Sequence, residues 1–537
     1  MARYNGLLPV LALTVVLIGN VQSANILGLF TSVSPSHLIV ELSMAKVLAE
    51  NGHNVTIVTV MKPLVTHKNF NVIMIPLTEE EERGRQASLG NIASIDNTNM
   101  IKAAFHLMGQ MNFMFDKMRN VMMSPRVKDL YENKDNKFDL VIVGFFLNNY
   151  QIGVAQKLKV PVVIASILPT NELFANILGN PRELSYVPFF DMALKQGETM
   201  TLPDRVKTLF ISLTFRALYM VIEKRNSEYY TEIFGDDPEM PRYEDLGKNV
   251  SLVLFNSHAV SEGPIRPNVP AVIEVGGIHI KDQPDPLPKN IAEFLDTAPN
   301  DAILLSLGSN VQGEHLKPET VQKMFNVLSK LKQRVVWKWE NLDKTPGKSS
   351  NILFSKWLPQ DDILAHPKIK LFITHAGKGG VSEAQYHGKP MLALPVFGDQ
   401  PVNAEKMVQD GFGLSMKLLE LEEQHFHENI LKVLEDSQFT ENVKRFSQVY
   451  RDRPMTARQT VLYWTEYVLR HHGAPHLQSP VVHMSFIAAH NLDVYALIIS
   501  LLLVFLFATK LVVRFIYRKF IKRKISKHSS KKKVKKT

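Results

Sequence analysis

Residues whose types and spacing could bind a charged, hydroxyl-rich ligand are concentrated between Trp357 and Gln400. The apolar run IKLFITH (369–375) is followed by the glycines Gly377, Gly379 and Gly380 and then by a segment with helical spacing. Glycine lets the backbone come close to an anion that lies over the first amides of the following helix. Glu383, one turn into that helix, is placed to accept hydrogen bonds from a diol. Trp357 offers a flat face to a base.

A second apolar run, PMLALPV (390–396), stops just before Gly398, Asp399 and Gln400. The carboxyl ends of parallel strands meet at one edge of an open α/β sheet, which is where such sheets bind ligands. Two neighbouring strand ends are therefore predicted to present polar groups at the same edge. Together with Trp357 and Gln360, this arrangement predicts a cradle for a nucleotide sugar.

The motifs W-L-P-Q, L-x-H-P, F-x-T-H-x-G, E-x-x-x-x-G-x-P and D-Q follow one another in register over 357–400. This stretch resembles the signature of UDP-glycosyltransferases of the UDP-glucuronosyltransferase type, the animal membrane-bound branch. The segments EVGGIHI (274–280) and SLGS (306–309) and the amino-terminal strand, loop and helix extend the resemblance over the whole chain. It implies an α/β fold of the GT-B type, with two Rossmann-like domains facing a cleft, plus one C-terminal transmembrane helix.

The resemblance also implies roles for the matching residues. Trp357 would stack on uracil, and Gln360 and Glu383 would bind the ribose. His375, Ser309 and the loop amides would bind the diphosphate, while Asp399 and Gln400 would hold the sugar hydroxyls. The implied donor-binding set is Arg266, Ser309, Trp357, Gln360, His375, Gly377, Gly379, Gly380, Glu383, Asp399 and Gln400.

No Asp-x-Asp motif occurs in the chain, so neither a diphosphate-chelating metal nor any cofactor besides the UDP-sugar co-substrate is expected. Backbone amides, a helix dipole and His375 would then offset the charge of the leaving group. The loop departs from the family pattern at two places. Ala376 stands where a glycine is usual, and Lys378-Gly379-Gly380 replaces Ser-Asn-Gly or Leu-Leu-Ser. Lys378 is a candidate to add positive charge near the phosphates.

His37 follows Ser34-Pro35-Ser36 at the predicted amino end of the first helix. The helix dipole disfavours an imidazolium there, so a neutral imidazole could accept a proton from a hydroxyl. In the family, the histidine at this position is the catalytic base, and its acid partner follows the strand written FDLVIV in this chain. Gly144 occupies the position of that acid. Asn149, a few residues later, is the predicted orienting partner, although an amide cannot offset the imidazolium charge.

The chain divides into five predicted regions. Residues 1–24, with Arg3 and an apolar run, have the pattern of a signal peptide. Residues 25–245 are assigned to an amino-terminal, acceptor-binding Rossmann-like domain, whose methionine-rich segment 100–123 packs on the core or lines an apolar cavity. Residues 250–470 are assigned to a carboxyl-terminal, UDP-sugar-binding domain. A transmembrane helix at 494–513 and a basic cytoplasmic tail at 514–537 follow.

The formal net charge of +10 comes from the tail, because residues 514–537 carry 12 lysines and arginines and no acidic residue. The rest of the chain has a net charge of −2, which gives no indication of a nucleic-acid surface. The chain has no cysteine and hence no disulfide. The span and tail predict a single-pass type I protein of the endoplasmic reticulum membrane, with its catalytic domains in the lumen. The lysines among residues 533–537 resemble a dilysine retrieval signal, and Asn249 opens a glycosylation sequon.

These features predict a metal-independent, inverting hexosyltransferase. It would transfer glucose or glucuronic acid from a UDP-sugar to a hydroxyl of small lipophilic acceptors, as in detoxification by conjugation. The missing acid at Gly144 leaves an alternative open, in which the chain is a catalytically weak UDP-sugar-binding partner of an active glycosyltransferase. The expected partners are the UDP-sugar, the acceptor and the membrane. Both homo- and hetero-oligomers remain compatible with the sequence.

Overall fold

The structure is a computed structural model of the 537-residue chain. It describes residues 23–92, 100–167, 177–188, 192–194, 197–261, 266–309, 311, 313 and 316–533. The predicted signal peptide, apart from its last two residues, and residues 534–537 of the predicted retrieval signal lie outside these ranges. The chain divides into two compact units, one ending at Gln478 and the other beginning at Ser479.

The first unit contains two parallel sheets. In the first sheet seven strands lie in the order β3-β2-β1-β4-β5-β6-β7, and every described pairing is parallel. Most of these strands are continuous apolar runs buried on both faces, as expected for a parallel sheet covered by helices. The strands are β1 (Asn25–Phe30), β2 (Asn54–Thr59), β3 (Phe70–Met74), β4 (Leu140–Phe145), β5 (Val162–Ser166), β6 (Val250–Phe255) and β7 (Val272–Glu274).

Helix α2 (Pro35–Glu50) follows β1 and is buried along most of its length. Pro35 lies in its first turn, where a missing N–H costs nothing, and Gly52 just beyond its end has φ of 92°. The methionine-rich helix α4 packs on the core through Phe115, Met118 and Met122, consistent with the packing interpretation. The helices of this half are α2, α3 (Glu79–Ile92), α4 (Met100–Met123), α5 (Pro125–Glu132), α6 (Gly153–Leu158) and α8 (Leu202–Phe234).

The second sheet has six parallel strands in the order β10-β9-β8-β11-β12-β13. These are β8 (Ala302–Ser306), β9 (Arg334–Lys338), β10 (Ile352–Ser355), β11 (Ile369–Thr374), β12 (Met391–Ala393) and β13 (Gly413–Ser415). Its helices are α9 (Lys289–Asp296), α10 (Pro318–Leu328), α11 (Gln360–Ala365), α12 (Lys378–His387), α13 (Gln400–Gln409), α14 (Glu423–Glu435), α15 (Ser437–Arg451) and α16 (Ala457–Arg470).

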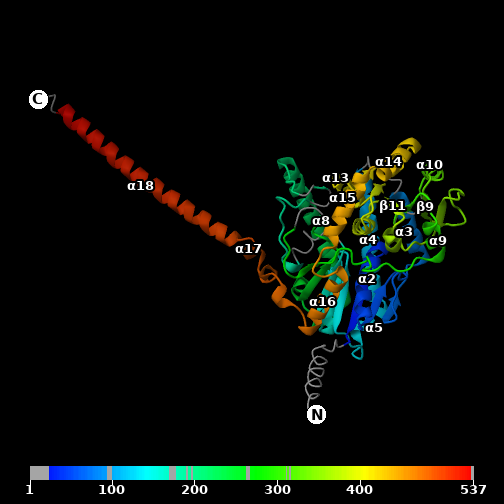
Figure 1. The fold of residues 1–537 in the computed structure, drawn as a ribbon. Helices are drawn as coiled ribbons and strands as arrows, with labels where there is room; N and C mark the ends of the chain where they lie inside the picture. Colours follow the sequence, from blue (N-terminus) through cyan, green and yellow to red (C-terminus); the bar gives the residue numbers. More distant parts are fainter. Residues whose placement is uncertain are drawn as a thin grey trace, which may run out of the picture. The chain divides into compact units, whose positions relative to one another are not determined.

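The predicted domain boundary at 245–250 is wrong. Strand β6 pairs with β5 and β7 pairs with β6, so both strands extend the first sheet, and the second sheet begins at Ala302. Helix α16, at the other end of the predicted second domain, also packs on the first half and lies beside α2 (Figure 1). Ala457, Val461 and Val468 belong to the same core cluster as the first sheet. An apolar run in the sequence predicts a strand but does not reveal which sheet it joins.

The second unit contains α17 (Phe486–Ala489) and α18 (Leu492–Lys533). By length and composition, the stretch from Leu492 to Ser526 is the one helix among the described residues that could cross a membrane. The predicted span 494–513 falls within it. The side chains of this stretch are largely solvent-exposed in the isolated chain, as expected for a segment whose neighbours would be lipids.

In both sheets, the direction in which successive strands are added changes next to the first strand of the sheet. In the first sheet, chain progression reverses between β1 and β4, and in the second between β8 and β11. At such switch points the loops leaving two adjacent strands turn to opposite sides and leave room for a ligand at the carboxyl edge. The predicted catalytic histidine follows β1, and the predicted diphosphate-binding histidine follows β11.

Candidate active site

His375 lies at the switch point of the second sheet, directly after β11, and its imidazole is held between two glycines. A β-carbon built on Gly308 would lie 2.6 Å from the His375 Nε2 atom, and one built on Gly377 would lie 2.8 Å from its Cε1 atom. Ser309 adjoins Gly308 in the loop after β8 and is half-buried. The two loops thus meet around this ring, and a side chain at either glycine would displace it.

The surroundings of His375 keep it neutral. Burial and the positive charge of Lys338 lower the pKa of His375 to about 4. Lys338, at the end of β9, donates hydrogen bonds to the Gly308 carbonyl (2.8 Å) and to Glu340 (2.8 Å). The Nδ1 atom of His375 is buried and has no hydrogen-bond partner among the described residues. Sequence reasoning missed Lys338 because RVVWKWE shows only a strand, and its nearness to His375 follows from the pairing of β9 with β8.

The loop after His375 is closed by a residue in the left-handed region. Ala376 has φ of 62° and is fully buried, which explains why glycine is the usual residue here. Its N–H donates to Thr374 Oγ1 (3.2 Å), and its carbonyl accepts from the Asn403 side chain (3.0 Å). Asn403 also donates to Asp399 (2.7 Å). Asn403 of α13 therefore joins Asp399 to the loop after β11.

Gln400 is 4% exposed, and its amide oxygen accepts hydrogen bonds from the backbone of Val396 and Phe397. This bonding shapes the turn that carries Asp399 and leaves the amide nitrogen of Gln400 to interact with a ligand. Asp399 itself is exposed at the start of α13. The two predicted sugar-binding residues are thus adjacent, but Asp399 presents an exposed carboxylate and Gln400 a mostly buried amide.

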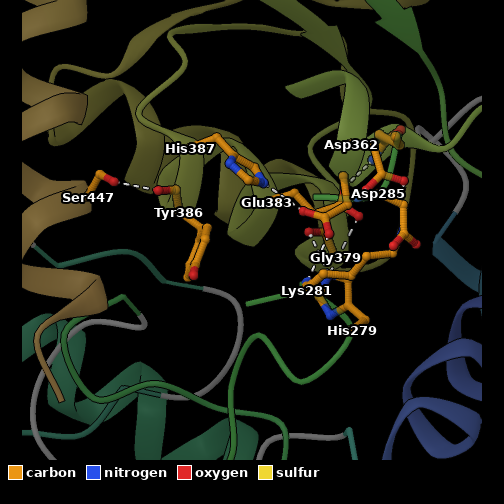
Figure 2. A network of polar contacts seen from close by, with 11 residues as sticks. His279, Lys281, Asp285, Asp362, Gly379, Glu383, Tyr386, His387 and Ser447 are labelled. Carbon is orange, nitrogen blue, oxygen red and sulfur yellow. Dashed lines mark hydrogen bonds and ion pairs between the residues drawn. The ribbon is translucent and has the colours of Figure 1, made fainter. Parts of the chain in front are cut away.

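Gln360 and Glu383 are brought together, as a shared ribose site requires. Gln360 begins α11, and its amide nitrogen donates a hydrogen bond to the Glu383 carboxyl group. Burial and, to a lesser extent, the negative charge of Asp361 raise the pKa of Glu383 to about 8. His279 lies on the other side of this carboxyl group, with Nε2 3.8 Å from Glu383 Oε1 and 3.2 Å from the Gly379 carbonyl oxygen (Figure 2).

The first turn of α11 holds the connector between the two sheets. Asp361 accepts from the backbone N–H of Lys281 (2.9 Å) and contacts His387 of α12 (2.6 Å). Asp362 accepts from the Lys281 ammonium group (2.6 Å) and from the backbone of Asp285 (2.8 Å), as Figure 2 shows in part. Sequence reasoning did not identify this network, because its members are distant in the chain and have no shared motif.

The remaining predicted donor residues are less closely joined. Trp357 is 51% exposed in the segment between β10 and α11, so about half of this side chain is accessible from solvent. Gly380 contacts the Gln360 side chain, since a β-carbon there would lie 3.3 Å from the Gln360 Nε2 atom. Arg266 lies in the loop between β6 and β7. The ammonium group of Lys378 lies 5.3 Å from the centre of the Phe255 ring, so this side chain is directed toward the first sheet.

His37 lies at the switch point of the first sheet, in the first turn of α2. Its Nδ1 atom is 3.2 Å from the Ser32 hydroxyl, and its ring centre is 5.2 Å from that of Phe146 beyond β4. Burial lowers the pKa of His37 to about 3. The imidazole is therefore neutral at physiological pH, as a proton acceptor must be.

Asn149 does not reach His37. Its amide nitrogen donates to Tyr219 (3.0 Å) and to Glu223 (2.7 Å), both on α8. The neighbouring Asn148 bonds to the backbone of Gly144 and Phe146 and so shapes the turn after β4. The prediction that Asn149 orients the imidazole thus finds no contact in the structure, because the turn after β4 directs this side chain toward α8.

Among the residues that the structure describes, no group of three or more histidines, aspartates and glutamates is placed to hold a metal ion. The groups at the second switch point that suit an anion are the amino end of α12 and His375, and the nearby Lys338 ammonium group is bonded to Gly308 and Glu340. A helix terminus with such neighbours binds phosphate without a metal ion.

Two parallel sheets with switch points at their carboxyl edges, one presenting a neutral histidine and the other a loop–helix anion site, define a glycosyltransferase of the GT-B class. Solved structures share this fold at low sequence identity. A UDP-glucosyltransferase from Polygonum tinctorium has a TM-score of 0.51 and 16% identity over 84% of this chain and 99% of that chain. A spinosyn forosaminyltransferase has a TM-score of 0.52 and 13% identity over 84% of this chain and 100% of that chain.

The chain belongs to the UDP-glycosyltransferase family, because the model described as "UDP-glucoronosyl and UDP-glucosyl transferase" matches residues 28–527. UDP-glycosyltransferase UGT5 of Dactylopius coccus is 33% identical over 92% of this chain and 93% of its own length. Human UDP-glucuronosyltransferase 1A1 is 28% identical over 96% of each chain. Family and fold together make the protein a UDP-sugar-dependent hexosyltransferase.

Proposed function

We propose that the protein transfers glucose or glucuronic acid from the UDP-sugar to a hydroxyl of a small lipophilic acceptor, with inversion, and that His37 is the general base. The observation that carries this proposal is the pairing of the two switch points. A neutral histidine opens α2 on the first sheet, and a histidine, two glycines and a helix amino end form an anion site on the second.

The two sheets approach each other at their carboxyl edges. Ser261, after β6, donates a hydrogen bond to Gln385 of α12 (2.6 Å), and Lys378 of α12 lies over Phe255 at the end of β6. A donor held over the amino end of α12 would therefore face the first half of the chain. This supports a reaction in which acceptor and donor come from opposite halves.

The proposed reaction is a single displacement. The acceptor oxygen forms a bond to the anomeric carbon while the bond from that carbon to the diphosphate oxygen breaks, and its electron pair leaves with UDP. The hydroxyl proton goes to His37, whose Nδ1 faces Ser32 and whose Nε2 is left for the acceptor. Attack from the side opposite the leaving group gives inversion. His375, Lys338 and the α12 amides stabilise the diphosphate.

In the proposed donor site, different residues bind the base, the ribose and the sugar. Trp357 supplies the exposed stacking face for uracil, and Gln360 with Glu383 binds the ribose hydroxyls. Asp399 and the amide nitrogen of Gln400 hold the sugar. The half-buried methionines of α4, including Met111 and Met114, give the first half adaptable apolar surface suited to lipophilic acceptors.

The test is UDP release by the full-length chain in membranes, with UDP-glucose or UDP-glucuronic acid and a phenolic acceptor. The expected result is turnover by the wild type and a loss of about 100-fold or more in His37→Ala, since general base catalysis contributes about 10²–10⁴-fold. Equal rates would remove the base assignment. Wild-type protein that binds UDP but releases none with either donor would favour the alternative of a UDP-sugar-binding partner subunit.

We further propose single-pass type I insertion in the endoplasmic reticulum, with residues 25–478 in the lumen. The apolar stretch of α18 is followed by lysines and arginines, which mark the cytoplasmic side. Glycosylation at Asn249, followed as a mobility shift removed by endoglycosidase H, is the expected result. An Asn249→Gln variant with the same mobility and sensitivity would show that this asparagine is unmodified.

A further inference from the structure

Glu41 is a buried carboxyl group that the reaction as described does not use. It lies on α2 four residues after His37, and its side chain is 1% exposed. Its Oε2 atom has no hydrogen-bond partner among the described residues. An unpartnered buried carboxyl group destabilises the fold, so its presence calls for a functional explanation.

The carboxyl group of Glu41 lies against Gly144 on β4. A β-carbon built on Gly144 would lie 2.7 Å from the Glu41 carboxyl carbon and 3.1 Å from its Oε2 atom. Position 144 is where the family pattern places the acid that accompanies the catalytic histidine. In this chain, the space that a side chain at 144 would occupy is filled by a carboxyl group from α2.

The same helix carries the His37 imidazole one turn earlier. Gly144 lies near the end of β4, and Phe146 is the first residue beyond that strand. The His37 ring packs on Phe146, while Glu41 packs on Gly144. Residues four apart on a helix are neighbours, with β-carbons about 5–6 Å apart. His37 and Glu41 are therefore neighbours along α2, and each contacts a residue at or just beyond the end of β4.

We propose that Glu41 is the charge partner of His37, supplied by the helix in place of the acid that the family carries on the strand. This inference rests on the proposed function. When His37 takes the acceptor proton on Nε2, the Glu41 carboxylate stabilises the imidazolium, and the Ser32 hydroxyl accepts the Nδ1–H. Glu41 touches neither substrate and is a positioning residue.

The pair has a defined pH dependence. Burial raises the pKa of Glu41 to about 8 and lowers that of His37 to about 3. Strands β1, β2 and β4 contribute no charged side chain, and α16 contributes Arg458, paired with Glu50, and Glu466, near His53. His37, one turn earlier on α2, is the titratable group that the proposal pairs with Glu41. Since the carboxylate form is required, wild-type turnover rises by about tenfold per pH unit up to about pH 8.

The test compares wild type, Glu41→Gln and a matched control, Glu50→Gln, which removes the other glutamate of α2 at the far end of the helix. UDP release by full-length protein in membranes is followed from pH 6 to 9. For Glu41→Gln, the expected result is a fall in kcat of about 100-fold or more, an unchanged KM for the UDP-sugar, and loss of the rise toward pH 8. The control should behave as wild type.

A glutamine variant within about threefold of the wild-type kcat and with the same pH profile would overturn the role of Glu41 while leaving the proposed function intact. A wild type that binds UDP without releasing it would instead overturn the proposed function, and this inference with it. The two failures are thus distinguished by the wild type alone.

A second pair of variants moves the acid back to the strand. Gly144→Asp alone should be impaired, because its side chain would collide with Glu41. Glu41→Ala opens that space. The double variant Glu41→Ala/Gly144→Asp should therefore have a kcat at least tenfold higher than that of Glu41→Ala. Protection by UDP against thermal unfolding shows that each variant is folded. No recovery in a folded double variant would indicate that Glu41 only fills space.

Discussion

The two switch points occupy the same place in their sheets but are built differently. In the second sheet, the part of the site around His375 is shaped by backbone: Gly308 and Gly377 enclose the ring, and the loop passes through Ala376 into α12. In the first sheet, the site is made of side chains from one helix: His37 and Glu41 lie along α2 against the end of β4. In the proposed reaction, the first kind of site binds the diphosphate and the second takes up a proton.

This difference explains why the two sites tolerate change differently. A site made of backbone and glycine requires particular residues at fixed positions, and its motif remains recognisable in the sequence. A site made of two side chains needs only that both groups reach one point in space. An acid can therefore come from the strand or from the facing helix, and Gly144 with Glu41 is a case of the second arrangement.

Among the variants that test this comparison, the largest effect on UDP binding is expected when the proposed uracil and ribose contacts are removed together. Trp357→Ala with Glu383→Ala should weaken UDP binding by about 100-fold or more, because base stacking alone contributes about 1–3 kcal/mol. The measurement is the UDP dissociation constant by calorimetry. His37→Ala is the control and should bind UDP as the wild type does. Unchanged UDP affinity in the double variant would contradict the donor site.

A single methyl group added to the loop around His375 should weaken UDP binding. Gly377→Ala places a β-carbon against the His375 ring and should weaken UDP binding by about tenfold, since the ring or the loop must move. Gly84→Ala on α3, where a β-carbon meets nothing, is the matched control. If both variants bound UDP equally well, the enclosure of His375 by glycine would have no role in binding.

The buried Glu41 carboxyl group should make the stability of the folded protein depend on pH. The folded-state pKa of Glu41 is raised from 4.5 to about 8, so the folded protein binds more protons than the unfolded chain between these values. Its contribution to stability is fully present below about pH 4.5 and is lost as the pH rises toward 8. Glu41→Gln should therefore raise the melting temperature by a few degrees at pH 8.5 and leave it nearly unchanged at pH 5. A uniform shift at both values would argue against a raised pKa.

The smallest effect is expected at Ala376. Ala376→Gly relieves a left-handed conformation and should stabilise the protein by up to about 1 kcal/mol, less the greater entropy of glycine in the unfolded chain. UDP affinity should stay the same, because the loop path is already that of the family glycine. The free energy of unfolding and the UDP dissociation constant, measured together, check this. A destabilised variant would mean that the methyl group packs more favourably than its backbone conformation costs.

Much of the site was predictable because its signals are local. The strand–glycine–helix pattern around His375 and the position of His37 depend on residues adjacent in the chain, and the structure places both at switch points. Lys338, His279 and Asp361 were not predictable, since each reaches the site from a separate strand, connector or helix. Asn149 was assigned to the imidazole from sequence proximity, and the turn after β4 directs it to α8 instead.

The sequence by itself determined the two alternating α/β halves, the strand–glycine loop–helix unit around His375, the histidine at the first helix and the apolar carboxyl-terminal helix. Each of these depends on periodicity or spacing within a short segment. Only the tertiary structure decided that β6, β7 and α16 belong to the first half, and that the carboxyl group facing Gly144 is that of Glu41. Pairing between distant segments is settled by packing of the whole chain, and a residue pattern along one strand carries no record of it.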